Sequence, residues 1–121
     1  GSAQADAVRT QSLTIYKKAA AVAYDRGIII ADTKLEFGVD ASTNQIILID
    51  ELLTPDSSRF WPEDGYQQGR SQTSFDKQYL RDYLLSINWD GTSPAPPLPK
   101  EVIKQVSLRY VEAFERLWGP E

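Results

Sequence analysis

A long helical pattern that stops at a glycine and is followed directly by a strand constrains the fold of this chain more than any other feature. Apolar residues recur at three- and four-residue steps over residues 6–26, as on the packed face of a helix. Gly27 is a typical helix terminator, and the isoleucine run 28–30 predicts a strand. We therefore expect a helix packed on a sheet. The predicted stripe consists of Leu13, Tyr16, Ala20 and Ala23.

A β-hairpin is predicted next, within an α+β fold that contains a small antiparallel sheet. Apolar and polar residues alternate over 34–39, a turn-forming run occupies 40–44, and 45–49 is a second strand. The pattern then predicts a long ordered loop over 54–74, a helix over 75–87, a Pro-rich connector over 93–99 and a helix over 100–117. The residues expected to face inward on the last helix are Val102, Val106, Tyr110 (or Leu108), Val111, Phe114 and Trp118.

The composition excludes several mechanisms. The 121 residues include no His and no Cys, so a thiolate nucleophile, a His-based catalytic triad and imidazole metal ligation are ruled out. Carboxylates, Lys, Arg, hydroxyls and hard cations such as Mg²⁺ remain. A net charge of −4 argues against a general nucleic-acid binder, and no apolar run is long enough to span a membrane.

The first residues differ in character from the rest. Gly1-Ser2 resembles the remnant of a cleaved tag, and the chain has no Met. We expect residues 1–5 to be a tag-derived, disordered start and residues 6–119 to form a single domain of a longer protein.

Charged residues alternate along the first hairpin strand. If residues 32–37 are extended, Asp32, Lys34 and Glu36 share one face, and the antiparallel return of the hairpin brings Asp50 to the same end. Carboxylates this close repel one another unless a cation lies between them, which favours a Mg²⁺ site that also contacts a nucleotide phosphate. A solvated ladder of surface charges is the alternative.

The turn of the hairpin imitates a calcium loop. Asp40, Ser42, Asn44 and Glu51 occupy positions of an EF-hand loop. The sixth position, which should be glycine, is Gln45, and the flanks are predicted as strands. We interpret Asp40 and Asn44 as turn formers, with a calcium-binding module as a minor hypothesis.

A second dense stretch lies at the start of the predicted loop. Ser57 and Ser58 precede Arg59, whose planar guanidinium suits a phosphate or carboxylate. Stacking of Arg59 on Trp61 within an ordered turn is the alternative.

These segments resemble one family in particular. The runs 31–38, 48–51, 54–61, 74–82 and 95–99 are similar to the C-terminal half of the SAICAR synthetases (phosphoribosylaminoimidazole-succinocarboxamide synthases), and the similarity extends over residues 12–119. The resemblance implies a cytoplasmic ligase that joins L-aspartate to carboxyaminoimidazole ribonucleotide with ATP and Mg²⁺, and it implies the fold of that enzyme's C-terminal lobe.

The resemblance also implies roles for individual residues. Glu36 and Asp50 match positions that hold Mg²⁺ and ATP. Asp32, Lys34 and Arg59 match positions that line the ribonucleotide site, with the Ser57-Ser58 turn beside it. We predict Asp32 and Lys34 as catalytic residues. The residues predicted to bind substrates are Asp32, Lys34, Ser57, Ser58, Arg59 and Lys77, with Lys77 and Arg81 as candidates for aspartate.

The chain departs from the family in length. Members are about twice as long, and the N-terminal half that covers the nucleotide is missing. We expect the chain alone to be inactive, to bind ATP weakly, and to self-associate through apolar surface that the missing lobe would cover. The alternative is a stand-alone module that binds a nucleotide or a protein partner without catalysis.

Overall fold

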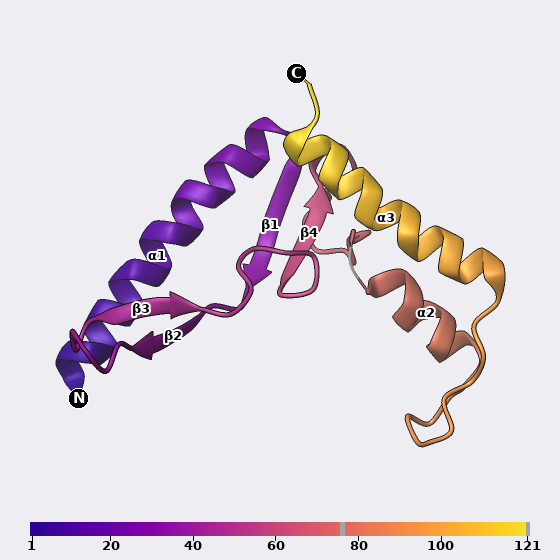
Figure 1. The fold of residues 1–121 in the computed structure, drawn as a ribbon. Coiled ribbons are helices and arrows are strands. Elements are labelled where there is room, and N and C mark those ends of the chain that lie inside the picture. The colour runs from indigo at the N-terminus through magenta and orange to yellow at the C-terminus, as the bar shows by residue number, and fades with distance from the viewer. Residues whose placement is uncertain (76, 121) are drawn as a thin grey trace.

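The computed structural model describes residues 1–75 and 77–120 and has an α+β fold, as predicted. The chain has three helices and two separate two-stranded antiparallel ribbons, of which one pairs β1 with β4 and the other pairs β2 with β3 (Figure 1). The elements are α1 (Ser2–Asp25), β1 (Ile28–Thr33), β2 (Glu36–Val39), β3 (Ile46–Ile49), β4 (Ser58–Pro62), the short 3₁₀ helix η1 (Glu63–Gly65), α2 (Gln78–Ser86) and α3 (Lys100–Trp118).

Helix α1 packs on β1, as the sequence predicts, but it is longer and slightly rotated. It begins at Ser2, so residues 2–5 are helical where a disordered start was expected. Ala23 is buried, and the hydroxyl of Tyr16 donates to the carbonyl of Ile30 at 2.7 Å. Leu13 is 47% exposed, so its predicted place in the packed stripe is wrong.

The predicted loop over 54–74 contains a core strand, which corrects the prediction. Strand β4 pairs with β1 in antiparallel fashion, from Ile28 opposite Pro62 to Thr33 opposite Ser58. Ile28, Ile30 and Phe60 are buried on one face of this ribbon. The sequence pattern misses β4 because its partner lies far away in the chain and because only Phe60 is a strongly apolar residue facing inward.

The β2–β3 hairpin forms as predicted. Phe37 lies opposite Leu48, and Val39 lies opposite Ile46. The Asp40 carboxylate accepts hydrogen bonds from the backbone N–H of Ser42 and Thr43 at 2.8 and 3.2 Å, so Asp40 is a turn former. The turn is flanked by strands β2 and β3, where an EF-hand loop has helices, so the structure does not support the EF-hand interpretation.

Two helix predictions need adjustment. Helix α2 begins at Gln78 rather than at 75; residue 76 lies outside the described residues, and Phe75 is a buried core residue. Helix α3 places Val102 and Ala113 against the core, while Val106 and Tyr110 are half-buried. The predicted inward positions at the C-terminal end are wrong, because Ala113 packs on the core and turns the larger side chains outward. The exposed residues on this outer side are Leu108, Val111, Phe114 and Trp118.

The three helices and the β1–β4 ribbon form an open wedge (Figure 1). The C-terminal ends of α1 and α3 meet at its apex, where Arg26 donates to the carbonyl of Gly119 at 2.7 Å and Arg116 to that of Gly27 at 3.1 Å. The helices diverge from there, with the hairpin beside α1 and α2 beside α3. No helix in the described ranges is long and apolar enough to cross a membrane.

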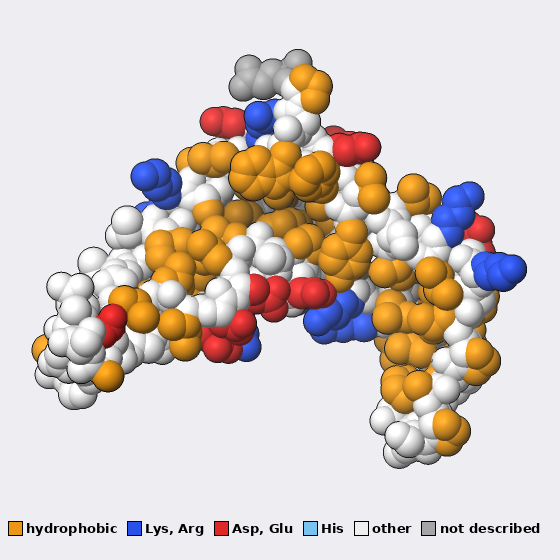
Figure 2. Space-filling model, viewed as in Figure 1, with side chains coloured by type: hydrophobic (Ala, Val, Ile, Leu, Met, Phe, Trp, Pro, Cys, Tyr) orange, Lys and Arg blue, Asp and Glu red, His pale blue; other side chains and the backbone are white. Residues whose placement is uncertain are grey.

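Charged side chains gather on the hollow side of the wedge. Figure 2 shows acidic and basic groups next to one another below the apolar centre, between the two arms. The strands bring these charges together, because their buried faces point toward α1 and α3 and their other faces point away.

Candidate functional site

An ion pair between Asp32 and Arg59 lies at the centre of the site. The register of the β1–β4 ribbon shifts between Ile30 and Asp32, so that Ile30 faces Phe60 and Asp32 faces Arg59. Such a bulge adds one residue to one strand and reverses its alternation. Regular alternation would put Asp32 on the buried face with Ile30; the bulge instead carries this carboxylate to the open face, beside Arg59.

The ion pair between Arg59 and Asp32 is bidentate. Arg59 Nε lies 3.0 and 3.1 Å from the two carboxylate oxygens of Asp32, and the guanidinium Nη2 also donates to Oδ2. These hydrogen bonds from Arg59 hold the pKa of the Asp32 carboxyl below its ordinary value. Both side chains remain about half exposed, so the pair is accessible to a ligand.

The turn before β4 places the two predicted serines differently. Ser57 Oγ accepts a hydrogen bond from the backbone N–H of Thr54 at 3.1 Å and stays near the surface. Ser58 is only 4% exposed, and its hydroxyl lies 2.7 Å from that of Thr33. The Ser58 hydroxyl therefore ties the two strands together, and of the two serines Ser57 is better placed to meet a ligand.

These groups border one hollow of about 350 Å³, which we call the Arg59 depression. Among the described residues, its cations are Arg59, Lys77 and Arg81, and its carboxylates are those of Asp32 and Asp56. Lys77 Nζ lies 3.9 Å from Asp56 Oδ1. Two arginines and a lysine with hydroxyl groups nearby suit a ligand that carries phosphate or carboxylate. The lining residues are Asp32, Asp56, Ser57, Ser58, Arg59, Lys77 and Arg81.

Asp56 is a lining residue that sequence reasoning did not assign to the site. Its carboxylate accepts a hydrogen bond from the hydroxyl of Tyr110 on α3 at 2.8 Å. The contact joins residues 54 positions apart, so no local pattern could have revealed it.

A second group of charges lies where the hairpin opens. The predicted continuous strand over 32–37 is wrong, because β1 ends at Thr33 and β2 begins at Glu36. Lys34 pairs with Glu36 at 2.5 Å rather than with Asp32. Glu36, with smaller contributions from Asp50 and Glu51, raises the pKa of the Lys34 ammonium. Lys34, Glu36 and Asp50 therefore form one cluster, the hairpin cluster. It adjoins the Arg59 depression, because the backbone N–H of Lys34 donates to the carbonyl of Ser57 at 2.9 Å.

The hairpin cluster fits a magnesium ion held jointly with a ligand. Glu36 lies opposite Ile49, the residue before Asp50, so both carboxylates are at the open end of the hairpin. Oxygen donors are those that Mg²⁺ prefers, and Mg²⁺ commonly takes only one or two carboxylates plus substrate phosphates. In the described part of the chain no third ligand joins them, so the remaining ligands would come from water and phosphate.

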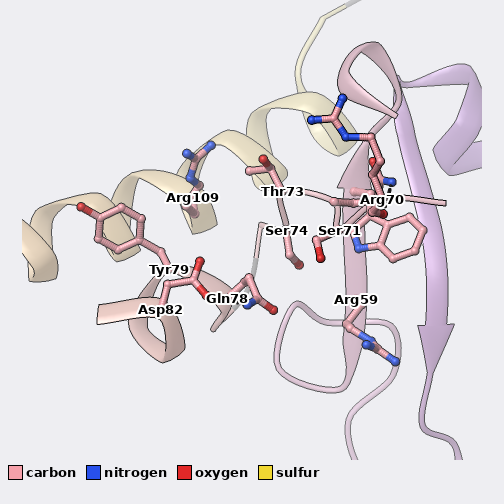
Figure 3. Close-up of a pocket in the computed structure, with 11 residues that line it drawn as sticks. Arg59, Arg70, Ser71, Thr73, Ser74, Gln78, Tyr79, Asp82 and Arg109 are labelled. Carbon is pink, nitrogen blue, oxygen red and sulfur yellow. Dashed lines mark hydrogen bonds between the residues drawn. The ribbon is translucent and has the colours of Figure 1, made fainter. Parts of the chain in front are cut away.

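A larger hollow of about 460 Å³ adjoins the first (Figure 3). We call it the Arg109 pocket. It lies between β4, residues 70–74, α2 and α3, and Arg59 lines both hollows. Sequence reasoning did not assign Arg109, Tyr79 or Asp82 to a site. The half-buried position of Arg109 depends on the packing of α3, which the sequence pattern did not predict correctly.

The chain is similar to SAICAR synthetases in sequence. The family model described as SAICAR synthetase matches residues 1–96. A phosphoribosylaminoimidazole-succinocarboxamide synthase from Methylobacillus flagellatus is 57% identical over 119 residues, which are 98% of this chain and 40% of that protein. The chain spans about two-fifths of the length of the curated relatives it matches.

Solved structures of SAICAR synthetases are also similar to this chain. A SAICAR synthase from Saccharomyces cerevisiae complexed with SAICAR matches with a TM-score of 0.81 and 46% identity, over 91% of this chain and 36% of that one. A SAICAR synthetase in complex with ADP matches with a TM-score of 0.64 and 26% identity, over 96% of this chain and 38% of that one.

Proposed function

The chain belongs to the SAICAR synthetase family, and on this premise we propose that it is the C-terminal catalytic part of a ligase of purine biosynthesis. The enzyme would join L-aspartate to the carboxylate of a carboxyaminoimidazole ribonucleotide and use ATP with Mg²⁺. The observation that carries the proposal is the Arg59 depression. Five of the residues predicted to bind substrates border this one hollow, namely Asp32, Ser57, Ser58, Arg59 and Lys77.

The Arg59 depression would bind the ribonucleotide. The guanidinium of Arg59 and the ammonium of Lys77 supply donors for phosphate or carboxylate oxygens. Asp32 and Asp56 supply acceptors for ribose hydroxyls and for the amino group of the imidazole. Arg59 lowers the pKa of Asp32, so this acceptor stays ionised to a lower pH than an ordinary aspartate.

The hairpin cluster would bind the nucleotide. Glu36 and Asp50 would hold Mg²⁺, which neutralises phosphate charge when it is bound. Lys34 lies between Asp32 and Glu36 in the chain, and it supplies a positive charge for a transferring phosphoryl group or a substrate carboxylate. We propose Asp32 and Lys34 as the residues nearest the reacting carboxylate.

The proposed reaction needs no protein nucleophile. The γ-phosphoryl group of ATP passes to an oxygen of the ribonucleotide carboxylate, which releases ADP. The aspartate amine then attacks the carbonyl carbon, the amide bond forms, and inorganic phosphate leaves with the carboxylate oxygen while the amine loses a proton. Positioning and charge neutralisation dominate such transfers, which fits a chain without His or Cys.

The isolated chain would lack this activity, since it spans about two-fifths of its relatives. Two carboxylates alone hold Mg²⁺ weakly. Its exposed apolar side chains, among them Phe114 at 64% and Trp118 at 75% exposure, would favour self-association. Sedimentation velocity over a range of concentrations measures this; a strict monomer at high concentration would contradict it.

A chimera tests the proposed function. This chain replaces the matching 40% of the Methylobacillus flagellatus relative, and the purified chimera is assayed for amide formation from the three substrates. Ligation that depends on ATP, aspartate and Mg²⁺ supports the proposal, with the isolated chain inactive in the same assay. A folded chimera without ligation would favour a non-catalytic module instead.

A further inference from the structure

We propose that Tyr110 on α3 is a positioning residue for the ribonucleotide. Its hydroxyl holds the Asp56 carboxylate in place, so that this carboxylate and the ammonium of Lys77 stay available to a ligand instead of pairing tightly with each other. The inference rests on the proposed function, which assigns Asp56 and Lys77 to the ribonucleotide and does not say what orients them.

One oxygen of Asp56 faces both a hydroxyl and an ammonium. The hydroxyl of Tyr110 donates to Asp56 Oδ1 at 2.8 Å, and Lys77 Nζ lies 3.9 Å from the same oxygen. Among residues 1–75 and 77–120, no hydrogen bond to the other oxygen, Oδ2, occurs. Tyr110 therefore fixes the carboxylate through one oxygen and leaves the second as an acceptor for a ligand.

The distance between Asp56 and Lys77 is long for an ion pair. A tight pair has an N–O distance of about 2.7–2.9 Å, which is well below the 3.9 Å found here. Both side chains are about half exposed, so burial does not keep them apart. The Tyr110 hydroxyl occupies one acceptor site of Oδ1 and restricts rotation of the carboxylate, and Lys77 therefore keeps its donors for phosphate.

The turn that carries Asp56 connects the two charged parts of the candidate site. Within it, the backbone N–H of Ser57 donates to the carbonyl of Thr54 at 3.1 Å. The carbonyl of Ser57 accepts from the backbone N–H of Lys34 at 2.9 Å. Because Tyr110 ties this turn to α3, the edge of the Arg59 depression depends on that helix as well as on the strands.

Core packing of α3 places the ring of Tyr110. Ala113, three residues further on, is 1% exposed, and Val106, four residues earlier, is half-buried. Residues three and four apart share one face of a helix, so Tyr110 lies on the core-facing side of α3, where it is half-buried. The helix thus gives the exposed Asp56 a rigid anchor.

Tyr110→Phe in the chimera tests the inference, because it removes only the hydroxyl. The KM for ribonucleotide is expected to rise about 3- to 10-fold, as for the loss of one hydrogen bond. The kcat and the KM values for aspartate and ATP should change less than about 2-fold, since only ribonucleotide binding is affected.

Tyr24→Phe is the matched control. The hydroxyl of Tyr24 also donates to an exposed carboxylate, that of Glu63 at 3.4 Å, but neither residue lines the Arg59 depression. This variant should leave all the kinetic constants unchanged.

Asp56→Ala distinguishes positioning through Asp56 from a general effect on the fold. It should raise the KM for ribonucleotide at least as much as Tyr110→Phe does. In the Asp56→Ala background, Tyr110→Phe should add less than about 2-fold, because the two changes remove the same interaction. A purely structural role of Tyr110 would instead lower the thermal midpoint and multiply this KM by the same factor in both backgrounds.

Several outcomes in an active chimera overturn the inference. They are an unchanged ribonucleotide KM in Tyr110→Phe or in Asp56→Ala, an equal rise of all three KM values in Tyr110→Phe, and an effect of Tyr110→Phe that is the same with and without Asp56. An inactive unmodified chimera would refute the proposed function itself.

Discussion

The two ribbons carry the two parts of the candidate site, and they are held in place by different means. The β1–β4 ribbon joins distant segments and has a buried face, with Ile28, Ile30 and Phe60 at most 5% exposed. The β2–β3 hairpin is local and closed by the Asp40 turn. It has little buried surface, since Ile47 is 43% exposed.

The difference explains how each set of charges is positioned. At the Arg59 depression, the core fixes the strand register, and the register sets Asp32 against Arg59. At the hairpin cluster, the charges are arranged by a turn and by the Lys34–Glu36 pair. We infer that the depression is preformed, whereas the cluster reaches its working arrangement only with a bound ligand.

Truncating the buried side chain of Phe60 in the β1–β4 ribbon should have the largest effect, which is on the stability of the fold. Phe60→Ala in the isolated chain is expected to lower the free energy of unfolding by about 3–5 kcal/mol, because the ring is 1% exposed. Urea unfolding followed by circular dichroism measures it. The matched control, Ile47→Ala in the hairpin, should cost less than about 1 kcal/mol. Equal losses of unfolding free energy in the two variants would mean that the core stabilises both ribbons to the same extent.

Asp50→Asn should have the next largest effect, on activity rather than stability. Loss of this carboxylate is expected to lower kcat of the chimera at least about 100-fold. The fold should persist, because Asp50 has φ +64° and Asn tolerates the left-handed region well. Turnover is compared across Mg²⁺ concentrations, with the thermal midpoint as a control. Near-normal turnover would remove Asp50 from the metal site.

Arg59→Gln should have a smaller effect on binding. Loss of the guanidinium is expected to raise the KM for ribonucleotide about 10- to 100-fold, as for a charged hydrogen bond worth about 1.5–3 kcal/mol. Asp32→Asn is the companion variant, since it removes the partner of Arg59 and a proposed acceptor but keeps the cation. A ribonucleotide KM unaffected by Arg59→Gln would show that Arg59 serves only to hold Asp32.

The smallest effect concerns pH. Since Arg59 lowers the pKa of Asp32 in the folded chain, the pair stabilises the fold above the ordinary carboxyl pKa. This stabilisation is lost as pH falls through the lowered pKa. Because both side chains are about half exposed, the ion pair should contribute less than about 1 kcal/mol to the free energy of unfolding. Carbon-detected NMR titration is expected to show Asp32 titrating below its ordinary range, and Arg59→Gln should move it upward. An unchanged titration would contradict the pairing.

Local patterns predicted the parts of the fold that local interactions form. The helix before Gly27, the hairpin with its Asp40 turn and the last helix from Lys100 were all expected where the structure has them, within a few residues. Strand β4 was predicted as a loop, because its pairing with β1 joins residues 25 to 34 positions apart and no periodicity within it indicates that contact.

The candidate site was predicted in its residues more than in its arrangement. Asp32, Ser57, Arg59 and Lys77 were singled out and lie around one hollow. The prediction that Asp32, Lys34 and Glu36 share one strand face is wrong, because a bulge and a strand break alter the alternation. The binding of the proposed substrates by these residues is a prediction.

The sequence by itself determined the family, the order of most elements and the chemical groups available, because these depend on residue type and on spacing along the chain. Only the tertiary structure decided that the charges divide into two groups and that a second hollow adjoins Arg59. Those features depend on a strand register and on the rotation of α3, which are set by burying Phe60 and Ala113 together. Packing of this kind joins distant residues, and no local pattern encodes it.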